Sequence, residues 1–263
     1  MKNCLLHCCI IPRVSKQIIG REILRYDQVA STNDLACEFA AHGAAEGLVI
    51  TAQEQLAGRG RMGRQWIVPR GTSLQFSILL RPPLASQHAT RLMPMAALAI
   101  ARTLEHEFNV LPTLKWPNDI LLDGKKVCGI LIESSIVGEK LAYVILGIGL
   151  NVNYTMRDYP ELAPFATTLQ DVLGQEIDRS NLERALLAEL DAYYARVCGG
   201  ESLTDKYRTR LGTLGQFIRV ASDDTILQGV AENVDDDGAL ILNQNGARVK
   251  LYAGDVTIIK GER

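Results

Sequence analysis

Arginine and glycine alternate in one short segment of the chain, and this combination is suited to binding an anion. Glycine lets the backbone approach a ligand and present its N–H groups. A guanidinium group pairs with phosphate or carboxylate through two parallel hydrogen bonds. The segment therefore predicts a loop that closes over an anion, with a solvated basic turn as the alternative. Its residues are Gly58, Arg59, Gly60, Arg61, Gly63 and Arg64.

The same segment also matches the G-x-G-x-x-G pattern of dinucleotide-binding proteins. That interpretation requires a helix directly after the glycines and an acidic residue about 20 positions further on. Here Pro69 and the β-type residues before it favour an extended chain, and no Asp or Glu occurs between Gly63 and Glu105. We therefore reject a Rossmann site.

A second group of polar residues, Lys115–Ile120, places a cation, an aromatic ring, an amide and a carboxylate at the end of one predicted strand. Asp119 is a candidate ligand for Mg²⁺, which takes few protein carboxylates and relies on phosphate oxygens. The alternative is that Asn118 and Asp119 only close a turn.

Two apolar runs further on carry residues that a plain strand would not need. Lys126 stands where a strand leaves a turn, so its ammonium group could face a pocket, or else be a solvated hairpin lysine. Gly147 and Gly149 weaken a strong strand unless something approaches the backbone closely. A flat ligand on the strand would explain both glycines, and so would a β-bulge.

The pattern of apolar residues predicts the elements that hold these groups. Ser31 should cap a helix that ends near Gly43. A second helix is expected at 92–108 and a third from a capping box of Ser180 and Glu183 to Gly199. Strands are expected at 48–52, 73–80, 113–116, 127–133 and 141–152.

After about Gly212 the pattern changes to short strands with turn-rich spacers. Five strands within about 50 residues favour a small barrel. We interpret Asp235–Asp237 as a solvated turn, because the run lacks the alternating ligands of a calcium loop. The expected strands are 217–220, 226–230, 239–242, 247–251 and 256–259.

Composition limits the class of protein. The chain has 263 residues, 47% of them hydrophobic, and a net charge of −2, which supports a real core and argues against bulk nucleic-acid binding. No apolar run is long enough for a membrane span. Six cysteines without a C-x-x-C pair indicate reduced thiols, so we expect a cytoplasmic protein. Cys4, His7, Cys8 and Cys9 lack the second half of a metal site.

Taken together and in this order, the motifs resemble those of the biotin–protein ligase family (biotin–acetyl-CoA-carboxylase ligases). The resemblance covers the chain from about Ile19 to its end. It implies an α+β fold: a class II synthetase-like mixed sheet flanked by helices in a catalytic domain (19–212), then a small SH3-like β-barrel (213–263). Residues 1–18 would be an N-terminal extension. We expect no helix-turn-helix and no repression by that route. The resemblance rests on Ser31–Asn33, Gln55, Gly58–Trp66, Lys115–Asp119, Lys126–Gly129 and Gly147–Asn151.

The resemblance also implies roles for individual residues. Catalysis would fall to Lys126, Arg61 and Lys115, and Asp119 would hold Mg²⁺. The chain departs from the family pattern at Met62, where another arginine is common. The nucleotide would be bound by Arg61, Trp66, Lys115, Asn118, Asp119 and Asn151. Biotin would be bound by Ser31, Thr32, Asn33, Gln55, Gly58, Arg59, Gly60, Arg61, Lys126, Gly129, Gly147 and Gly149.

The implied activity is a carbon–nitrogen bond-forming ligase reaction that needs ATP, Mg²⁺ and biotin. The expected partner is a biotin carboxyl carrier protein or domain, with no nucleic acid and no membrane, and the protein would be a monomer or homodimer. One alternative is a lipoate or octanoate ligase or transferase of related fold. The other is a non-catalytic partner-binding relative, against which the intact Lys126 and Asp119 speak.

Overall fold

A seven-stranded sheet forms the larger part of the molecule, and it is mixed, as the resemblance implies. The computed structural model describes residues 17–138, 140–222 and 225–259, so the cysteines and histidine of the first nine residues lie outside it. In spatial order the strands are β1 (Glu22–Val29), β2 (Leu48–Gln55), β3 (Leu74–Leu80), β7 (Lys140–Leu150), β6 (Lys125–Val137), β5 (Asp119–Leu122) and β4 (Thr113–Lys115). Strands β1 and β2 are parallel, and each other neighbouring pair is antiparallel.

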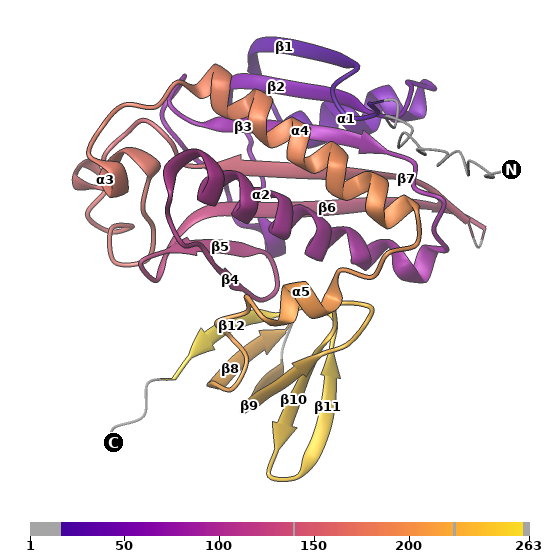
Figure 1. Cartoon of the computed structure of the whole chain (residues 1–263), viewed down its shortest axis with the longest axis vertical. Coiled ribbons are helices and arrows are strands. Elements are labelled where there is room, and N and C mark those ends of the chain that lie inside the picture. The colour runs from indigo at the N-terminus through magenta and orange to yellow at the C-terminus, as the bar shows by residue number, and fades with distance from the viewer. Residues whose placement is uncertain (1–16, 139, 223–224, 260–263) are drawn as a thin grey trace, which may run out of the picture.

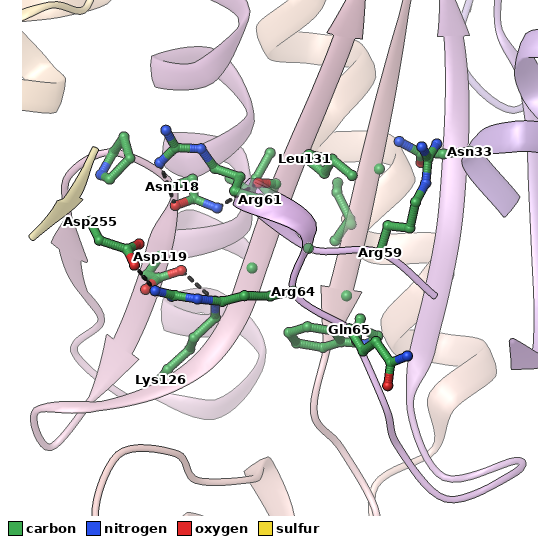
Figure 2. A pocket seen from close by; sticks show the side chains of 18 of the residues that line it. Asn33, Arg59, Arg61, Arg64, Gln65, Asn118, Asp119, Lys126, Leu131 and Asp255 are labelled. Carbon is green, nitrogen blue, oxygen red and sulfur yellow. Dashed lines mark hydrogen bonds and ion pairs between the residues drawn. The ribbon is translucent and has the colours of Figure 1, made fainter. Parts of the chain in front are cut away.

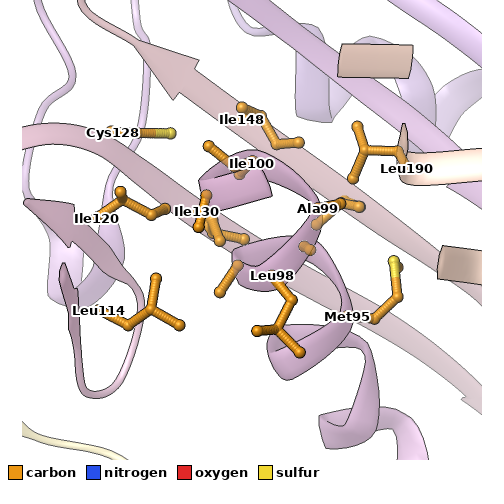
Figure 3. Packing of buried hydrophobic residues seen from close by; sticks show 14 of the residues in the cluster. Met95, Leu98, Ala99, Ile100, Leu114, Ile120, Cys128, Ile130, Ile148 and Leu190 are labelled. Carbon is orange, nitrogen blue, oxygen red and sulfur yellow. The ribbon is translucent and has the colours of Figure 1, made fainter. Parts of the chain in front are cut away.

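Helices cover both faces of this sheet (Figure 1). Helices α2 (Leu92–Phe108) and α4 (Arg179–Cys198) pack together on one face, and α1 (Thr32–Ala41) lies on the other. Small residues allow α2 to be buried between the sheet and α4, since Ala96, Ala99 and Ala101 have no exposed surface. Figure 3 shows Ala99 of α2 next to Leu190 of α4. The remaining helical segments are α3 (Leu169–Leu173), α5 (Thr204–Arg208) and 3₁₀ turns at Arg61–Gly63, Ser86–Arg91 and Met156–Asp158.

The helix starts show one success and one error of the sequence interpretation. Ser31 caps α1, where its hydroxyl accepts a hydrogen bond from the Asp34 backbone N–H. The capping box of Ser180 and Glu183 is wrong. Asp178 is the N-cap of α4, because its carboxylate accepts from the backbone N–H groups of Ser180 and Asn181, at 2.9 and 3.1 Å. Glu183 instead pairs with Arg25 of β1 at 2.7 Å.

The C-terminal residues form a second, antiparallel sheet, drawn below the first in Figure 1. Its strands follow the order β11 (Ala247–Leu251), β10 (Leu240–Gln244), β9 (Thr225–Val234), β8 (Phe217–Ser222) and β12 (Asp255–Ile258). This arrangement is consistent with an SH3-like domain. The pairings among the described residues leave β11 and β12 at the two edges, so closure into a barrel is not seen.

The acidic turn between β9 and β10 is stabilised by hydrogen bonds between its own residues. The Asp235 carboxylate accepts the backbone N–H groups of Asp237 and Ala239, each at 3.0 Å. Across the described ranges of the chain, no three His, Cys, Asp or Glu side chains gather where they could hold a metal ion.

Trp116 joins the two sheets. Its backbone N–H donates to the Thr213 hydroxyl at 3.0 Å, and its indole N–H donates to the Gly238 carbonyl at 2.9 Å. The side chain is 2% exposed. These contacts connect the end of β4 to the segment before β8 and to the turn between β9 and β10. Within the same described part of the chain, no helix has the length and apolar character that crossing a bilayer requires.

Candidate active site

A row of glycines makes a hollow in the large sheet. Side chains of a strand alternate between its two faces, so the odd-numbered positions of β6 and β7 point away from α2 and α4. On this face Gly129 pairs with Gly149, and Leu131 pairs with Gly147. Three of these four positions lack a side chain, and a cavity of about 310 Å³ lies over them. The cavity therefore lies where the glycines of two neighbouring strands fall on the same face of the sheet.

The two glycines of β7 are required by side chains that cross them. A Cβ atom at Gly147 would lie 2.3 Å from the Asn33 amide oxygen, and one at Gly149 would lie 2.4 Å from the Trp66 indole. The pairing of β7 is regular at both positions, with no bulge. The sequence left two explanations for these glycines, a close approach to the backbone or a β-bulge. The structure shows a close approach, made by the side chains of Asn33 and Trp66.

The arginine segment folds as a short hairpin over this cavity. The Trp66 N–H donates to the Gly58 carbonyl at 2.8 Å, and the Gly60 N–H donates to the Arg64 carbonyl at 2.7 Å. The turn places Met62 and Gly63 in the left-handed region, with φ of 54° and 71°. Glycine adopts that region freely, whereas Met62 does so at a cost.

The hairpin's first two arginines face opposite ends of the cavity (Figure 2). Arg59 points toward Asp34 and Glu133, forming ion pairs with both. Arg61 points toward Asn118, 3.4 Å from its amide oxygen, and lies equally far from the Gly254 carbonyl. Burial lowers the pKa of Arg61, and the Asp119 carboxylate opposes that shift. Arg61 stays charged at neutral pH because the ordinary pKa of arginine is so high.

Four cations line the end of the cavity where Arg61 points: Arg61 itself, Lys115, Lys126 and Arg64, which is paired with Asp255. The Lys126 ammonium lies 2.6 Å from the Asp119 carboxylate and 5.6 Å from the centre of the Trp66 ring. Lys115 is the register partner of Asp119 across β4 and β5. Arg61, Lys115 and Lys126 thus approach one space from three separate segments. An excess of positive charge in a partly enclosed space favours a polyanionic ligand.

Beside Arg59, the opposite end of the cavity is lined by uncharged polar groups in fixed orientations. The Gln55 amide oxygen accepts from the Thr32 N–H at 2.8 Å and from its hydroxyl at 3.0 Å. The Asn33 amide oxygen accepts from the Ser77 hydroxyl at 2.5 Å. Ser31, Thr32 and Asn33 are buried. Such groups can present donors and acceptors to a small planar polar ligand.

Two residues predicted for the site do not line the cavity. Gly58 lies at the base of the hairpin, where a Cβ would be 2.5 Å from the Trp66 carbonyl oxygen. Asn151 is buried, and its amide donates to the Thr167 carbonyl at 3.0 Å. All other predicted binding residues do line it.

The sequence interpretation missed lining residues that come from other elements. Asp255, Val256 and Thr257 reach the cavity from β12 of the small sheet. Nothing in their local sequence marks them, because only the packing of the two sheets brings them there. Phe76 of β3 is also part of the lining and was not predicted. Asp255 forms an ion pair with Arg64 of the hairpin, so the small sheet contacts the loop directly.

Comparisons with known proteins agree with this two-part architecture. Residues 26–151 match the sequence model of the biotin/lipoate A/B protein ligase family, and residues 213–258 match that of the biotin protein ligase C-terminal domain. The bifunctional ligase/repressor BirA of Bacillus subtilis is 34% identical over 248 residues, covering 92% of this chain and 75% of that protein.

Two further comparisons cover nearly whole chains. The biotin–[acetyl-CoA-carboxylase] ligase of Mycobacterium tuberculosis is 34% identical over 258 residues, which is 93% of each protein. Among solved structures, the biotin protein ligase of Aquifex aeolicus in complex with biotin and ATP superposes with a TM-score of 0.75. It is 24% identical and covers 92% of this chain and 100% of its own. At this level of identity, the similarity to the Aquifex aeolicus structure shows a shared fold.

Proposed function

This chain belongs to the biotin/lipoate A/B protein ligase family, and we propose that it is an ATP-dependent biotin–protein ligase whose active site is the cavity under the arginine hairpin. The observation that carries the proposal is the convergence of Arg61, Lys115 and Lys126 on one space beside an uncharged polar end. The match of residues 213–258 to the biotin protein ligase C-terminal domain favours biotin over lipoate.

The polar end is suited to the ureido ring of biotin. We assign the ring contacts to Ser31, Thr32, Asn33 and Gln55, whose hydrogen-bonding groups are held by their neighbours. The flat strand surface at Gly129 and Gly147 gives room for the fused rings, and Arg59 and Gly60 close the hairpin above them. The biotin carboxylate would then point toward Lys126.

The first half-reaction needs cations more than it needs a nucleophile from the protein. A biotin carboxylate oxygen attacks the α-phosphorus of ATP, the bond to the β-phosphate oxygen breaks, and pyrophosphate leaves. Negative charge grows on the phosphoryl oxygens during this step, so cations already fixed beside them stabilise the transition state. We assign this role to Lys126 and Arg61, with Lys115 and Asn118 toward the pyrophosphate and Trp66 toward the nucleotide base. Asn151 is bonded to the Thr167 carbonyl outside the cavity, so we assign it no contact with the nucleotide.

Asp119 suits a bound Mg²⁺ ion. Its carboxylate lines the cavity, and Mg²⁺ commonly takes one or two protein carboxylates together with phosphate oxygens. When bound, the ion would neutralise charge on the nucleotide phosphates. Within this chain, Lys126 holds the Asp119 carboxylate in place through the 2.6 Å ion pair.

The second half-reaction transfers biotin to a carrier protein. The amine of the acceptor lysine attacks the acyl carbon of biotinyl-AMP, the bond to the phosphate oxygen breaks, AMP leaves and the amine loses a proton. Water would destroy this mixed anhydride, so the hairpin shields it until the carrier arrives. The proposed acceptor is the biotin carboxyl carrier domain of acetyl-CoA carboxylase. We assign the chemistry to a catalytic domain of residues 19–212 and a supporting domain of residues 213–263.

Mass spectrometry of an acceptor domain tests this function. The protein is incubated with Mg²⁺, ATP, a biotin carrier domain and either biotin or lipoate. We expect the mass of one biotin to be added to the carrier, and no comparable addition from lipoate. Addition of lipoate instead would assign the cavity to the related ligases, and failure to release pyrophosphate with either acid would exclude a ligase.

A further inference from the structure

One carboxylate outside the cavity contacts both the hairpin and the polar end. Glu133 lies on β6, two positions after Leu131 and therefore on the same face of the strand. Its carboxylate accepts a hydrogen bond from the Asn33 amide nitrogen at 2.6 Å. The same carboxylate forms an ion pair with the Arg59 guanidinium at 3.1 Å.

We propose that Glu133 is a positioning residue that couples closure of the arginine hairpin to the orientation of Asn33. The inference rests on the proposed function, because it concerns how that site retains its acyl-adenylate. Glu133 does not line the cavity itself, so it acts through two residues that do.

The contact between Glu133 and Asn33 depends on the orientation of the Asn33 amide, that is, on which neighbour its nitrogen and its oxygen each face. Glu133 accepts only from a nitrogen donor, and the Ser77 hydroxyl donates to the Asn33 oxygen. Together these two neighbours fix the amide in one orientation, with its oxygen over Gly147. Without Glu133 the amide could turn over, and the donor and acceptor offered to biotin would exchange places.

The Arg59 side depends on charge. Asp34, in the first turn of α1, also pairs with Arg59, so two carboxylates from different elements hold this guanidinium. Their side chains are 56% and 32% exposed, so each pair alone contributes modestly. With the hairpin over the cavity, as in this structure, Arg59 reaches both carboxylates. Loss of either carboxylate should therefore shift the hairpin toward the open state and release biotinyl-AMP sooner.

Release of preformed biotinyl-AMP, measured by rapid dilution of the loaded enzyme, tests the proposal. Glu133→Gln keeps an acceptor for Asn33 but loses the charge that Arg59 needs. We expect roughly fivefold faster release with a KM for biotin near that of the wild type. Glu133→Ala loses both contacts, so we expect faster release together with a higher KM for biotin.

Two comparisons separate this coupling from a general loss of structure. Asp34→Asn should resemble Glu133→Gln, because the Asp34 carboxylate pairs with Arg59 while the Asn33 amide nitrogen keeps its bond to Glu133. Glu38→Gln, on the exposed side of α1, should behave as the wild type. Adding Glu133→Gln to Arg59→Ala should cause no further release, because the two residues act as one unit.

Different results would contradict the proposed role of Glu133 and the proposed ligase function. Wild-type release by Glu133→Gln, or an undiminished effect of that change in the Arg59→Ala background, would overturn the coupling and leave the ligase function intact. A wild-type protein that forms no biotinyl-AMP would overturn the proposed function and this inference with it.

Discussion

At the scale of single residues, the site depends on charged groups that reach one cavity from separate elements. Lysine, arginine and aspartate in recognisable motifs indicated a site for a charged ligand, and the structure brings Arg61, Lys115, Lys126 and Asp119 to one cavity. Glu133 was overlooked because its neighbours in space, Asn33 and Arg59, are 100 and 74 positions away. Counting by twos from Gly129 along β6 would have placed it on the cavity face.

The absence of a side chain at Gly149 leaves the space that the Trp66 ring occupies. The Trp66 ring lies so close to the strand that Gly149→Ala should displace it, since the ring is the movable partner in a 2.4 Å contact. We expect the tryptophan emission of this variant to differ in position or intensity from that of the wild type. Trp66→Phe identifies the part of the signal that comes from this ring, because the chain has only one other tryptophan. Unchanged emission in Gly149→Ala would contradict the packing described.

At the scale of elements, strong apolar patterns gave reliable boundaries. Helix α2 occupies 92–108 as expected, because its apolar residues face both the sheet and α4. Strand β1 was missed, since most of its residues are exposed or half-buried at the edge of the sheet and show no clear alternation. Strand β5 was missed because it has only four residues and begins directly after the turn that follows β4, where Asp119 pairs with Lys115 across a hairpin.

The start of α4 provides a direct test at this scale. Asp178→Ala removes the side chain that accepts from two free N–H groups, which should lower the free energy of unfolding by about 1 kcal/mol. Ser180→Ala removes the hydroxyl that the sequence pattern suggested as the cap, and should change it little. Urea denaturation of both variants decides between the two caps. Equal destabilisation by the two substitutions would argue against Asp178.

At the scale of the whole molecule, the two sheets share one functional site. Residues of β12 line the cavity, and Arg64 of the hairpin pairs with Asp255 of the same strand. The change of pattern near Gly212 predicted the second sheet but not its position. Sequence patterns report local periodicity, whereas the junction depends on single contacts such as that between Trp116 and Thr213.

Substitution at the junction should therefore affect stability. Thr213→Ala leaves the buried Trp116 N–H without its acceptor, and we expect a loss of about 1–3 kcal/mol in the free energy of unfolding. Thr209→Ala, an exposed hydroxyl on a nearby turn, is the matched control and should have little effect. Chemical denaturation monitored by circular dichroism measures both. A Thr213 variant as stable as the Thr209 variant would show that this hydrogen bond does not hold the sheets together.

The central claim, that cations from separate segments act on one developing charge, is tested most directly by the rate at which a single turnover forms biotinyl-AMP. Lys126→Ala removes the cation beside Asp119 and should slow this step by about a hundredfold or more, in line with the loss of one fixed donor in other active sites. Lys125→Ala, which removes an exposed lysine at the preceding position, should leave the rate unchanged. If Lys126→Ala forms biotinyl-AMP as fast as the wild type, the cavity does not work as described.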